Sequence, residues 1–90
     1  MSDAVKIEHP HIVRLEGVCG GEPVIEGLRV TVRHVVTLHQ HGETILDIAG
    51  ALGLSEAQVF HALSYFFDHR EEIVTLIAQE ELAHARFPRS

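Results

Sequence analysis

The sequence has few of the residues on which several protein classes depend. Its one cysteine, Cys19, excludes an internal disulfide, so we expect a reducing location such as the cytoplasm. No uncharged apolar run is long enough to cross a bilayer, and the first 10 residues carry no apolar run of the signal-peptide kind. There are 7 lysines and arginines against 13 aspartates and glutamates, a formal net charge of −6. This acidic balance argues against nucleic acid as the main partner.

Residue clusters typical of metal binding or catalysis are also missing. The 8 histidines include two close pairs, at His9 and His11 and at His39 and His41. A zinc site needs three or four ligands, and the sequence has neither a cysteine pair nor a His-Glu-x-x-His motif. The carboxylates form no recognisable catalytic set, and Cys19 has no basic neighbour that would activate it. We therefore expect no metal, no cofactor and no enzymatic activity.

Enough apolar residues are present for one folded domain. They make up 46% of the 90 residues, which suffices for a modest core. We expect a single domain over residues 11–86, with flexible ends at 1–10 and 87–90. A chain this short buries little surface, and an N-terminal strand would leave backbone groups unpaired, so we also expect a homodimer.

The strongest pattern covers residues 44–67 and predicts two helices joined by a tight turn. Thr44 can cap the first helix, and Gly53 can end it in the left-handed conformation. Between them, apolar residues at i, i+3, i+4 and i+7 define one helical face: Ile45, Ile48, Ala49 and Leu52.

The second helix of this pair has its own start signals. Ser55 can cap it, with Gln58 at capping-box spacing, and Leu54 and Val59 have the spacing of a hydrophobic staple. The turn, caps and staple together resemble the helix-turn-helix of DNA-binding proteins, whose second helix reads the DNA. An ordinary helical hairpin is the alternative, because this geometry alone does not establish DNA binding.

Shorter patterns precede this pair. Residues 11–15 and 23–25 are rich in β-formers and predict two strands around a glycine-rich turn. Residues 28–30 continue an alternating pattern and are expected to be extended. The alternation runs on to Arg33, where it overlaps a helical pattern. We expect the helix to begin near Val32, with Thr31 as its cap, and to stop at Gly42.

The C-terminal part predicts a last helix. Asp68 and Glu71 have capping-box spacing, an apolar stripe follows them, and the helix is expected to end near His84. The predicted fold class is therefore mainly α. It consists of a short N-terminal extended or β segment followed by a homeodomain-like helix-turn-helix bundle of three to four helices.

Part of the chain resembles a known family. Residues 20–30 are similar to the "gGkPvI-G-tR-i-V" signature of the family called domain of unknown function 433, and later positions fit its two helical motifs. The resemblance extends over about 12–77. Glu22 and Leu28 depart from the signature, where Lys and Thr are common, and this weakens any role of the loop in gripping phosphate. The matching residues are Gly21, Pro23, Val24, Ile25, Gly27, Arg29, Val32, Gly42, Ile48, Leu54, Val59, Leu63 and Tyr65.

The resemblance also implies a function. Members of this bacterial and archaeal family are often encoded beside small nuclease-like proteins and described as antitoxins, and no catalytic residues carry over. We therefore expect a non-catalytic antitoxin-like protein that acts as a dimeric regulator. It would bind a basic, toxin-like partner and, weakly on its own, DNA. The alternative is a dimeric protein-interaction module whose helix-turn-helix serves assembly without DNA binding.

Basic residues are scarce where such a helix pair would meet DNA. No lysine or arginine occurs in residues 34–69, although phosphate neutralisation supplies most DNA affinity. Arg29 lies in the glycine-rich signature, where we expect it to pair with an acid of the fold. The candidate DNA contacts are Arg14, Arg29, Arg33, Gln58 and His61.

A second candidate surface would bind a protein. Phe60 falls on the outward side of the second predicted helix of the pair, where an aromatic suits a protein interface better than DNA. The last helix is rich in acids that could dock a basic partner, although a solvated outer face explains each acid singly. The candidate partner contacts are Phe60, Glu71, Glu72, Glu80 and Glu81.

Overall fold

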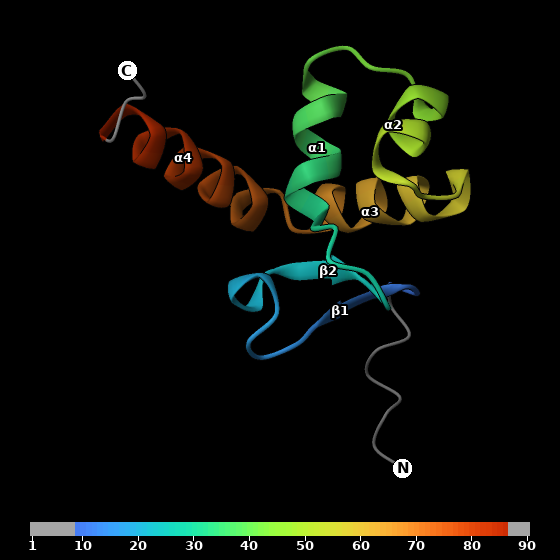
Figure 1. Cartoon of the computed structure of the whole chain (residues 1–90), viewed down its shortest axis with the longest axis horizontal. Coiled ribbons are helices and arrows are strands. Elements are labelled where there is room, and N and C mark those ends of the chain that lie inside the picture. The colour runs from blue at the N-terminus through green and yellow to red at the C-terminus, as the bar shows by residue number, and fades with distance from the viewer. Residues whose placement is uncertain (1–8, 87–90) are drawn as a thin grey trace.

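The computed structural model describes residues 9–86 of the chain. Within that range, two short strands and a 3-10 turn precede four α-helices (Figure 1). The elements are β1 (Ile12–Arg14), η2 (Cys19–Gly21), β2 (Pro23–Ile25), α1 (Val32–Gln40), α2 (Ile45–Leu52), α3 (Glu56–Asp68) and α4 (Arg70–Arg86). The expected mainly helical fold with a short N-terminal β segment is confirmed. The two ends predicted to be flexible lie almost entirely outside the described residues.

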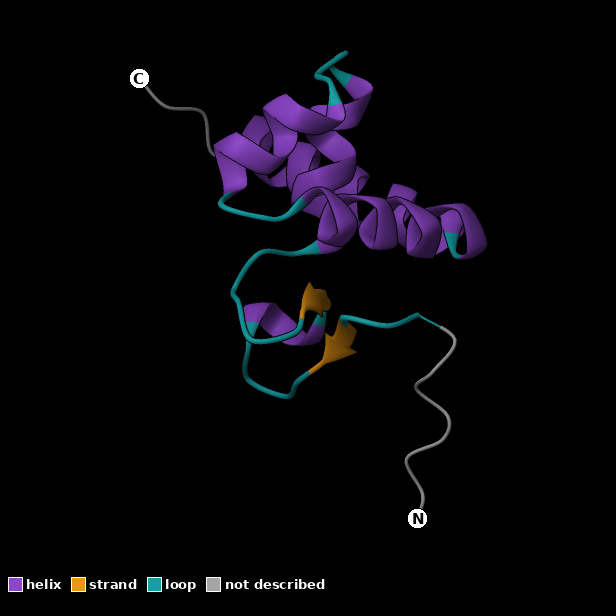
Figure 2. Ribbon diagram, turned by 90° about the vertical axis from the view of Figure 1, so that its right-hand side faces the viewer, coloured by secondary structure: helices purple, strands orange, loops and turns teal. Residues whose placement is uncertain are grey.

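The N-terminal segment is an antiparallel hairpin below the helices (Figure 2). Ile12 pairs with Ile25, and Arg14 pairs with Pro23. The two strand segments were predicted, whereas their pairing with each other was not. Residues 28–30 are not extended as expected. Residues 28 and 29 form a bend after Gly27, whose φ of 84° suits glycine. The chain meets β2 again where the Val30 carbonyl accepts the Ile25 N–H at 2.9 Å and Thr31 bridges to Val24.

Helix α1 begins with a reciprocal cap. The Thr31 hydroxyl accepts a hydrogen bond from the His34 backbone N–H at 3.0 Å, and His34 Nδ1 accepts one from the Thr31 N–H at 3.1 Å. The Thr31 cap was predicted, whereas the part that His34 plays was not. The cap fixes the start of α1 so that Val32, Val35 and Val36 are fully buried.

Helices α2 and α3 form the pair expected from the sequence. Thr44 caps α2 by accepting from the Asp47 N–H, and Gly53 ends it with φ 71° in the left-handed region. Ser55 and Gln58 form a complete capping box at the start of α3. These local signals agree with each other, which is why the boundaries of this pair could be read from sequence.

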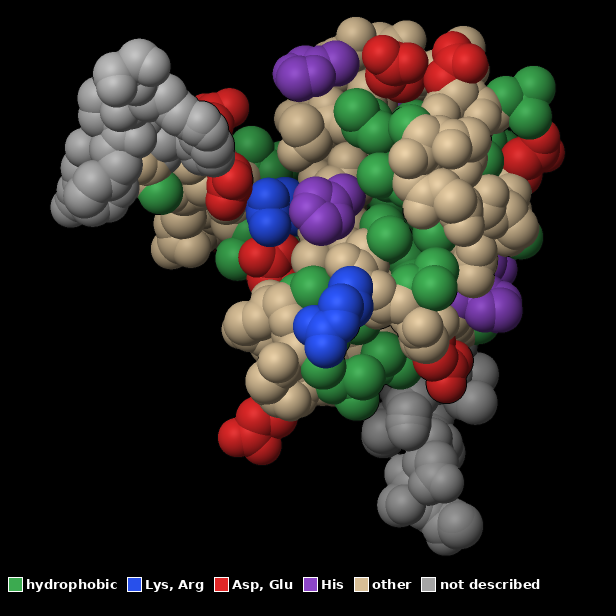
Figure 3. All heavy atoms as spheres, viewed as in Figure 1, with side chains coloured by type: hydrophobic (Ala, Val, Ile, Leu, Met, Phe, Trp, Pro, Cys, Tyr) green, Lys and Arg blue, Asp and Glu red, His purple; other side chains and the backbone are tan. Residues whose placement is uncertain are grey.

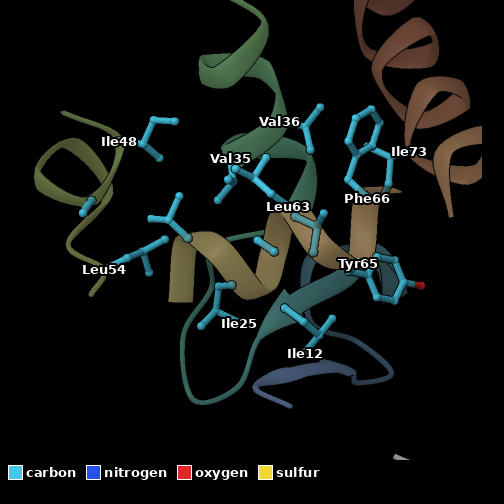
Figure 4. Packing of buried hydrophobic residues seen from close by; sticks show 14 residues of the cluster. Ile12, Ile25, Val35, Val36, Ile48, Leu54, Leu63, Tyr65, Phe66 and Ile73 are labelled. Atoms are coloured by element: carbon cyan, nitrogen blue, oxygen red, sulfur yellow. The ribbon is translucent and has the colours of Figure 1, made fainter. Parts of the chain in front are cut away.

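Helix α3 lies at the centre of the core. It packs against α1, α2, β1 and the beginning of α4, and Figure 4 shows its apolar side chains among those of the other elements. The buried side chains that α3 contributes are Val59, Ala62, Leu63, Tyr65 and Phe66. One side of α3 is therefore buried in the core, and the other side faces away from it.

Helix α4 projects from the body of the molecule (Figure 1). Ile73 is fully buried, but Val74 and Leu82 keep 48% and 61% of their surface exposed. The expectation that Asp68 caps this helix is wrong, because α3 continues through Asp68 and α4 begins at Arg70 after a break at His69. No helix within residues 9–86 combines the length and the apolarity needed to cross a membrane.

Candidate interaction surfaces

Arg14 belongs to a bridge between three elements. Its guanidinium on β1 donates to the Tyr65 hydroxyl of α3 at 2.8 Å and pairs with the Glu72 carboxylate of α4. The Tyr65 hydroxyl donates in turn to Glu72 at 2.8 Å. Burial and this hydrogen bond to Glu72 raise the pKa of Tyr65 to about 12. Arg14 therefore holds the hairpin against the helices, and its charge is already opposed by a carboxylate.

Arg33 lies in a second bridge. Its Nε donates to both carboxylate oxygens of Glu22 at 3.1 and 3.3 Å, and its Nη1 lies 3.7 Å from Glu80 Oε1. The Arg33 and Glu22 side chains are only 17% and 18% exposed. A lysine at position 22, as the family signature prefers, would place a like charge beside Arg33. In this chain, Glu22 departs from the signature and joins the hairpin loop to α1 through Arg33.

Arg29 behaves differently from the expectation. It is exposed and makes no ion pair with any residue of the described range, so the prediction that it pairs with an acid of the fold is wrong. Arg33, four residues later, takes that role. On the face in Figure 3, blue side-chain atoms are sparse and are partly bordered by red carboxylates. Of the three predicted arginines, Arg29 alone presents an unopposed charge.

The two remaining DNA candidates lie on α3. The Gln58 side-chain oxygen accepts the Ser55 N–H at 2.9 Å, so capping occupies it. The half-buried His61 ring packs against His11, with 4.8 Å between ring centroids. Neither side chain extends from the helix as a groove-reading residue would.

The outward side of α3 is apolar. Phe60 and Phe67 are 57% and 52% exposed, and the exposed Ala57 and Ser64 lie beside them. These four residues recur at helical spacing, and we call them the outer stripe. The Arg70 guanidinium lies over the Phe67 ring at 5.0 Å from its centroid. The stripe presents two aromatics where a DNA-reading helix would carry polar or basic side chains.

The four glutamates of α4 divide into two pairs. Glu72 and Glu80 point toward the body, where they pair with Arg14 and Arg33. Glu71 and Glu81 are exposed and form no ion pair within the described residues. Within the described residues, this second pair of carboxylates is therefore the one whose charge no arginine opposes.

A groove lies between α1 and α4. It holds about 240 Å³. Apolar atoms of α4 form much of its wall, and polar side chains of both helices border it. The lining residues are Gln40, Val74, Ile77, Ala78 and Glu81. An acidic rim beside an apolar wall suits a side chain or short segment that is itself apolar and basic.

Two histidines, His9 and His69, lie at the C-terminal end of α3. His9 is buried, with Nε2 3.1 Å from Asp68 Oδ2, and its ring meets the edges of the Tyr65 and His69 rings. No group of three or more potential ligands in the described part of the chain could hold a metal ion. Asp68, expected to cap α4, instead joins the segment before β1 to α3. The sequence spacing of His9 and Asp68 gave no signal for this contact.

The fold defines a small, mainly helical protein with an N-terminal β-hairpin. The chain belongs to the family described as "Protein of unknown function (DUF433)", which matches residues 12–66. That match ends before α4, whereas the signature resemblance suggested an extent to about residue 77. No curated protein matches the chain.

A solved structure is similar in fold. A DUF433 member protein from Anabaena variabilis ATCC 29413 superposes with a TM-score of 0.73 and is 28% identical. The similarity covers 83% of this chain and 75% of that one. The arrangement of hairpin and helices is therefore shared between the two proteins, and α4 lies beyond the residues that the family description matches.

Proposed function

We propose that this chain is a non-catalytic, antitoxin-like protein that binds a basic partner protein through α4. The single observation that carries the proposal is the division of the α4 acids. Glu72 and Glu80 are used by the fold, while Glu71 and Glu81 remain exposed. The antitoxin character itself comes from the family resemblance.

Charge and shape support the same partner chemistry. The chain carries a net charge of −6, and the groove between α1 and α4 has Glu81 beside apolar side chains. An acidic surface attracts a basic protein over a distance, and an apolar groove then supplies close contact. A small nuclease with a positively charged cleft has these properties.

DNA is a second, weaker ligand in this proposal. The α2–turn–α3 unit would be a helix-turn-helix, and the protein would act as a dimeric regulator in the cytoplasm. The lack of basic residues on the outer side of α3 speaks for weak binding by the chain alone. In the alternative, the same helix pair serves assembly only, and the apolar outer stripe favours that reading.

Co-expression with the neighbouring gene provides the first test. A complex that copurifies would identify the partner, and stopped-flow mixing would then measure its association rate. Reversing Glu71 and Glu81 to lysine is expected to slow association on the order of tenfold and to flatten its salt dependence. These two residues are preferable to Glu72 and Glu80, whose reversal would also break the bridges to Arg14 and Arg33.

A matched control separates local docking from overall charge. Glu16→Lys with Glu26→Lys changes the net charge by the same amount at exposed positions in the hairpin segment. The control is expected to slow association much less than the α4 variant. Equal slowing by both double variants would show that only net charge matters and would refute docking at α4.

A further inference from the structure

The outer stripe of α3 has no covering element among the described residues. Phe60, Ser64 and Phe67 recur at i, i+4 and i+7, so they lie along one line on the helix. Both phenylalanines keep more than half of their surface exposed, at 57% and 52%. Two aromatics aligned on one exposed helix face are typical of a surface that another protein covers.

Opposite charges stand at the two ends of this stripe. Glu56 is the first residue of α3, and Arg70 lies just beyond its last residue, with the guanidinium 5.0 Å from the centroid of the Phe67 ring. Neither residue has an ion-pair partner in the described part of the chain. The stripe is therefore negative at one end, positive at the other and apolar between.

We propose that this face binds the same face of a second copy of the chain, with the two α3 helices antiparallel about a two-fold axis near Ser64. Such an axis lies midway between Phe60 and Phe67, so Phe60 of each copy packs against Phe67 of the other. The small Ser64 side chain at the axis lets the helices approach closely. Because a two-fold contact is self-complementary, each pairing occurs twice.

The same geometry pairs the charges. In an antiparallel arrangement, Glu56 of one copy faces Arg70 of the other at both ends of the contact. The 13 residues of α3 span about 20 Å, so the two charge pairs flank a continuous apolar contact. Parallel helices would instead place like charges together. Charge complementarity therefore favours a second copy of the chain as the partner and an antiparallel orientation of the two α3 helices.

The interface deepens the function proposed above, because it names the surface of the dimer on which that proposal rests, whereas partner docking uses α4 and α1. Helix α1 packs on the buried side of α3, so the groove between α1 and α4 stays accessible in the dimer. The stripe itself becomes covered. In this assembly the outer face of α3 is covered by protein, which favours the alternative in which the helix pair serves assembly over DNA reading by α3.

Sedimentation equilibrium on the purified protein tests the apolar contact. The wild-type chain is expected to be a dimer in the micromolar range. Phe60→Glu should raise the dimer dissociation constant by roughly a hundredfold or more, since it removes two central aromatics per dimer. Leu46→Glu is the control, because Leu46 is 67% exposed on α2 and lies outside the stripe. A monomeric wild type, or equal dissociation by both variants, would overturn the proposal.

Charge exchange tests the direction of packing. Glu56→Arg and Arg70→Glu should each weaken the dimer on the order of tenfold, and combining them should restore it, because the pairs re-form with reversed sign. Far-UV circular dichroism confirms that each variant is folded. A double variant that dissociates more than either single one contradicts antiparallel pairing.

Cross-linking locates the axis. In a Cys19→Ser background, Ser64→Cys should form an intermolecular disulfide under mild oxidation, because the two Ser64 positions face each other at the axis. Thr75→Cys, at an exposed position on α4, should not. Equal cross-linking at both positions would mean random collision and would refute an axis at Ser64.

Discussion

At the scale of single residues, His34 connects helix capping to pH. Its Nδ1 must be unprotonated to accept the Thr31 N–H, and burial together with the charge of Arg33 lowers the pKa of His34 below its usual 6.5. Between that lowered pKa and 6.5 the unfolded chain binds more protons than the folded one. This contribution to stability is therefore complete above pH 6.5 and is lost as the pH falls toward the folded-state pKa.

Replacing His34 by Gln tests this dependence. Glutamine can supply the same acceptor in the capping box, as Gln58 does at the start of α3, but it does not titrate. We expect urea unfolding from pH 7.5 to 5.5 to show a smaller loss of stability in His34→Gln than in the wild type. An identical pH slope in the two proteins would remove His34 as a source of acid sensitivity.

Tyr65 is expected to reduce stability at high pH, whereas His34 does so at low pH. It is the one tyrosine of the chain, so absorbance at 295 nm reports its ionisation alone. Its pKa is raised from 10.0 to about 12, first by burial and then by the bond to Glu72. The neutral form therefore stabilises the fold fully below pH 10, and this stabilisation is lost as the pH rises toward 12.

A spectroscopic titration measures this shift. We expect ionisation of Tyr65 in the folded protein to occur well above its midpoint in urea-unfolded protein. Tyr65→Phe should cost about 1 kcal/mol at neutral pH, from the lost hydroxyl bridge, while the direct Arg14–Glu72 pair remains. Coincident midpoints in folded and unfolded protein would show that the hydroxyl is solvated and that the bridge does not form.

At the scale of elements, the turn between α2 and α3 depends on Gly53. Its φ of 71° lies in the left-handed region, where a β-branched side chain is strained. Gly53→Val should destabilise the fold by roughly 1–2 kcal/mol, whereas Gly53→Asn should cost less because asparagine tolerates this conformation. Thermal unfolding compares the two. Equal melting temperatures for all three proteins would mean that the turn relaxes without strain.

Local caps and long-range bridges differ in how well they can be predicted from the sequence. Caps at Thr44 and Ser55 could be predicted because their partners lie three residues away. The bridges from Arg14 to Glu72 and from Arg33 to Glu80 could not, because they join residues on elements that are far apart in the sequence. For the same reason Arg29 was assigned an internal partner that Arg33 has instead. Local hydrogen bonds leave a sequence pattern, and contacts between distant elements leave none.

At the scale of the whole molecule, the ion pairs leave few arginine charges unopposed. Arg14 and Arg33 are opposed by carboxylates, and Arg70 lies over the Phe66 and Phe67 rings. Among the described arginine side chains, this leaves Arg29 exposed with neither an ion pair nor a ring contact. The negative charge is also shared unevenly, because α4 keeps Glu71 and Glu81 exposed.

This distribution predicts weak DNA binding with a shallow dependence on salt. Of the described arginine side chains each chain offers Arg29, so through them a dimer neutralises about two phosphates and log K should fall with log salt at a slope near −2. Fluorescence anisotropy with DNA from upstream of the gene, between 50 and 200 mM salt, measures it. Arg29→Ala should abolish most of the slope. A steep slope with tight binding by the chain alone at neutral pH would mean that the bridges of Arg14 and Arg33 open on DNA.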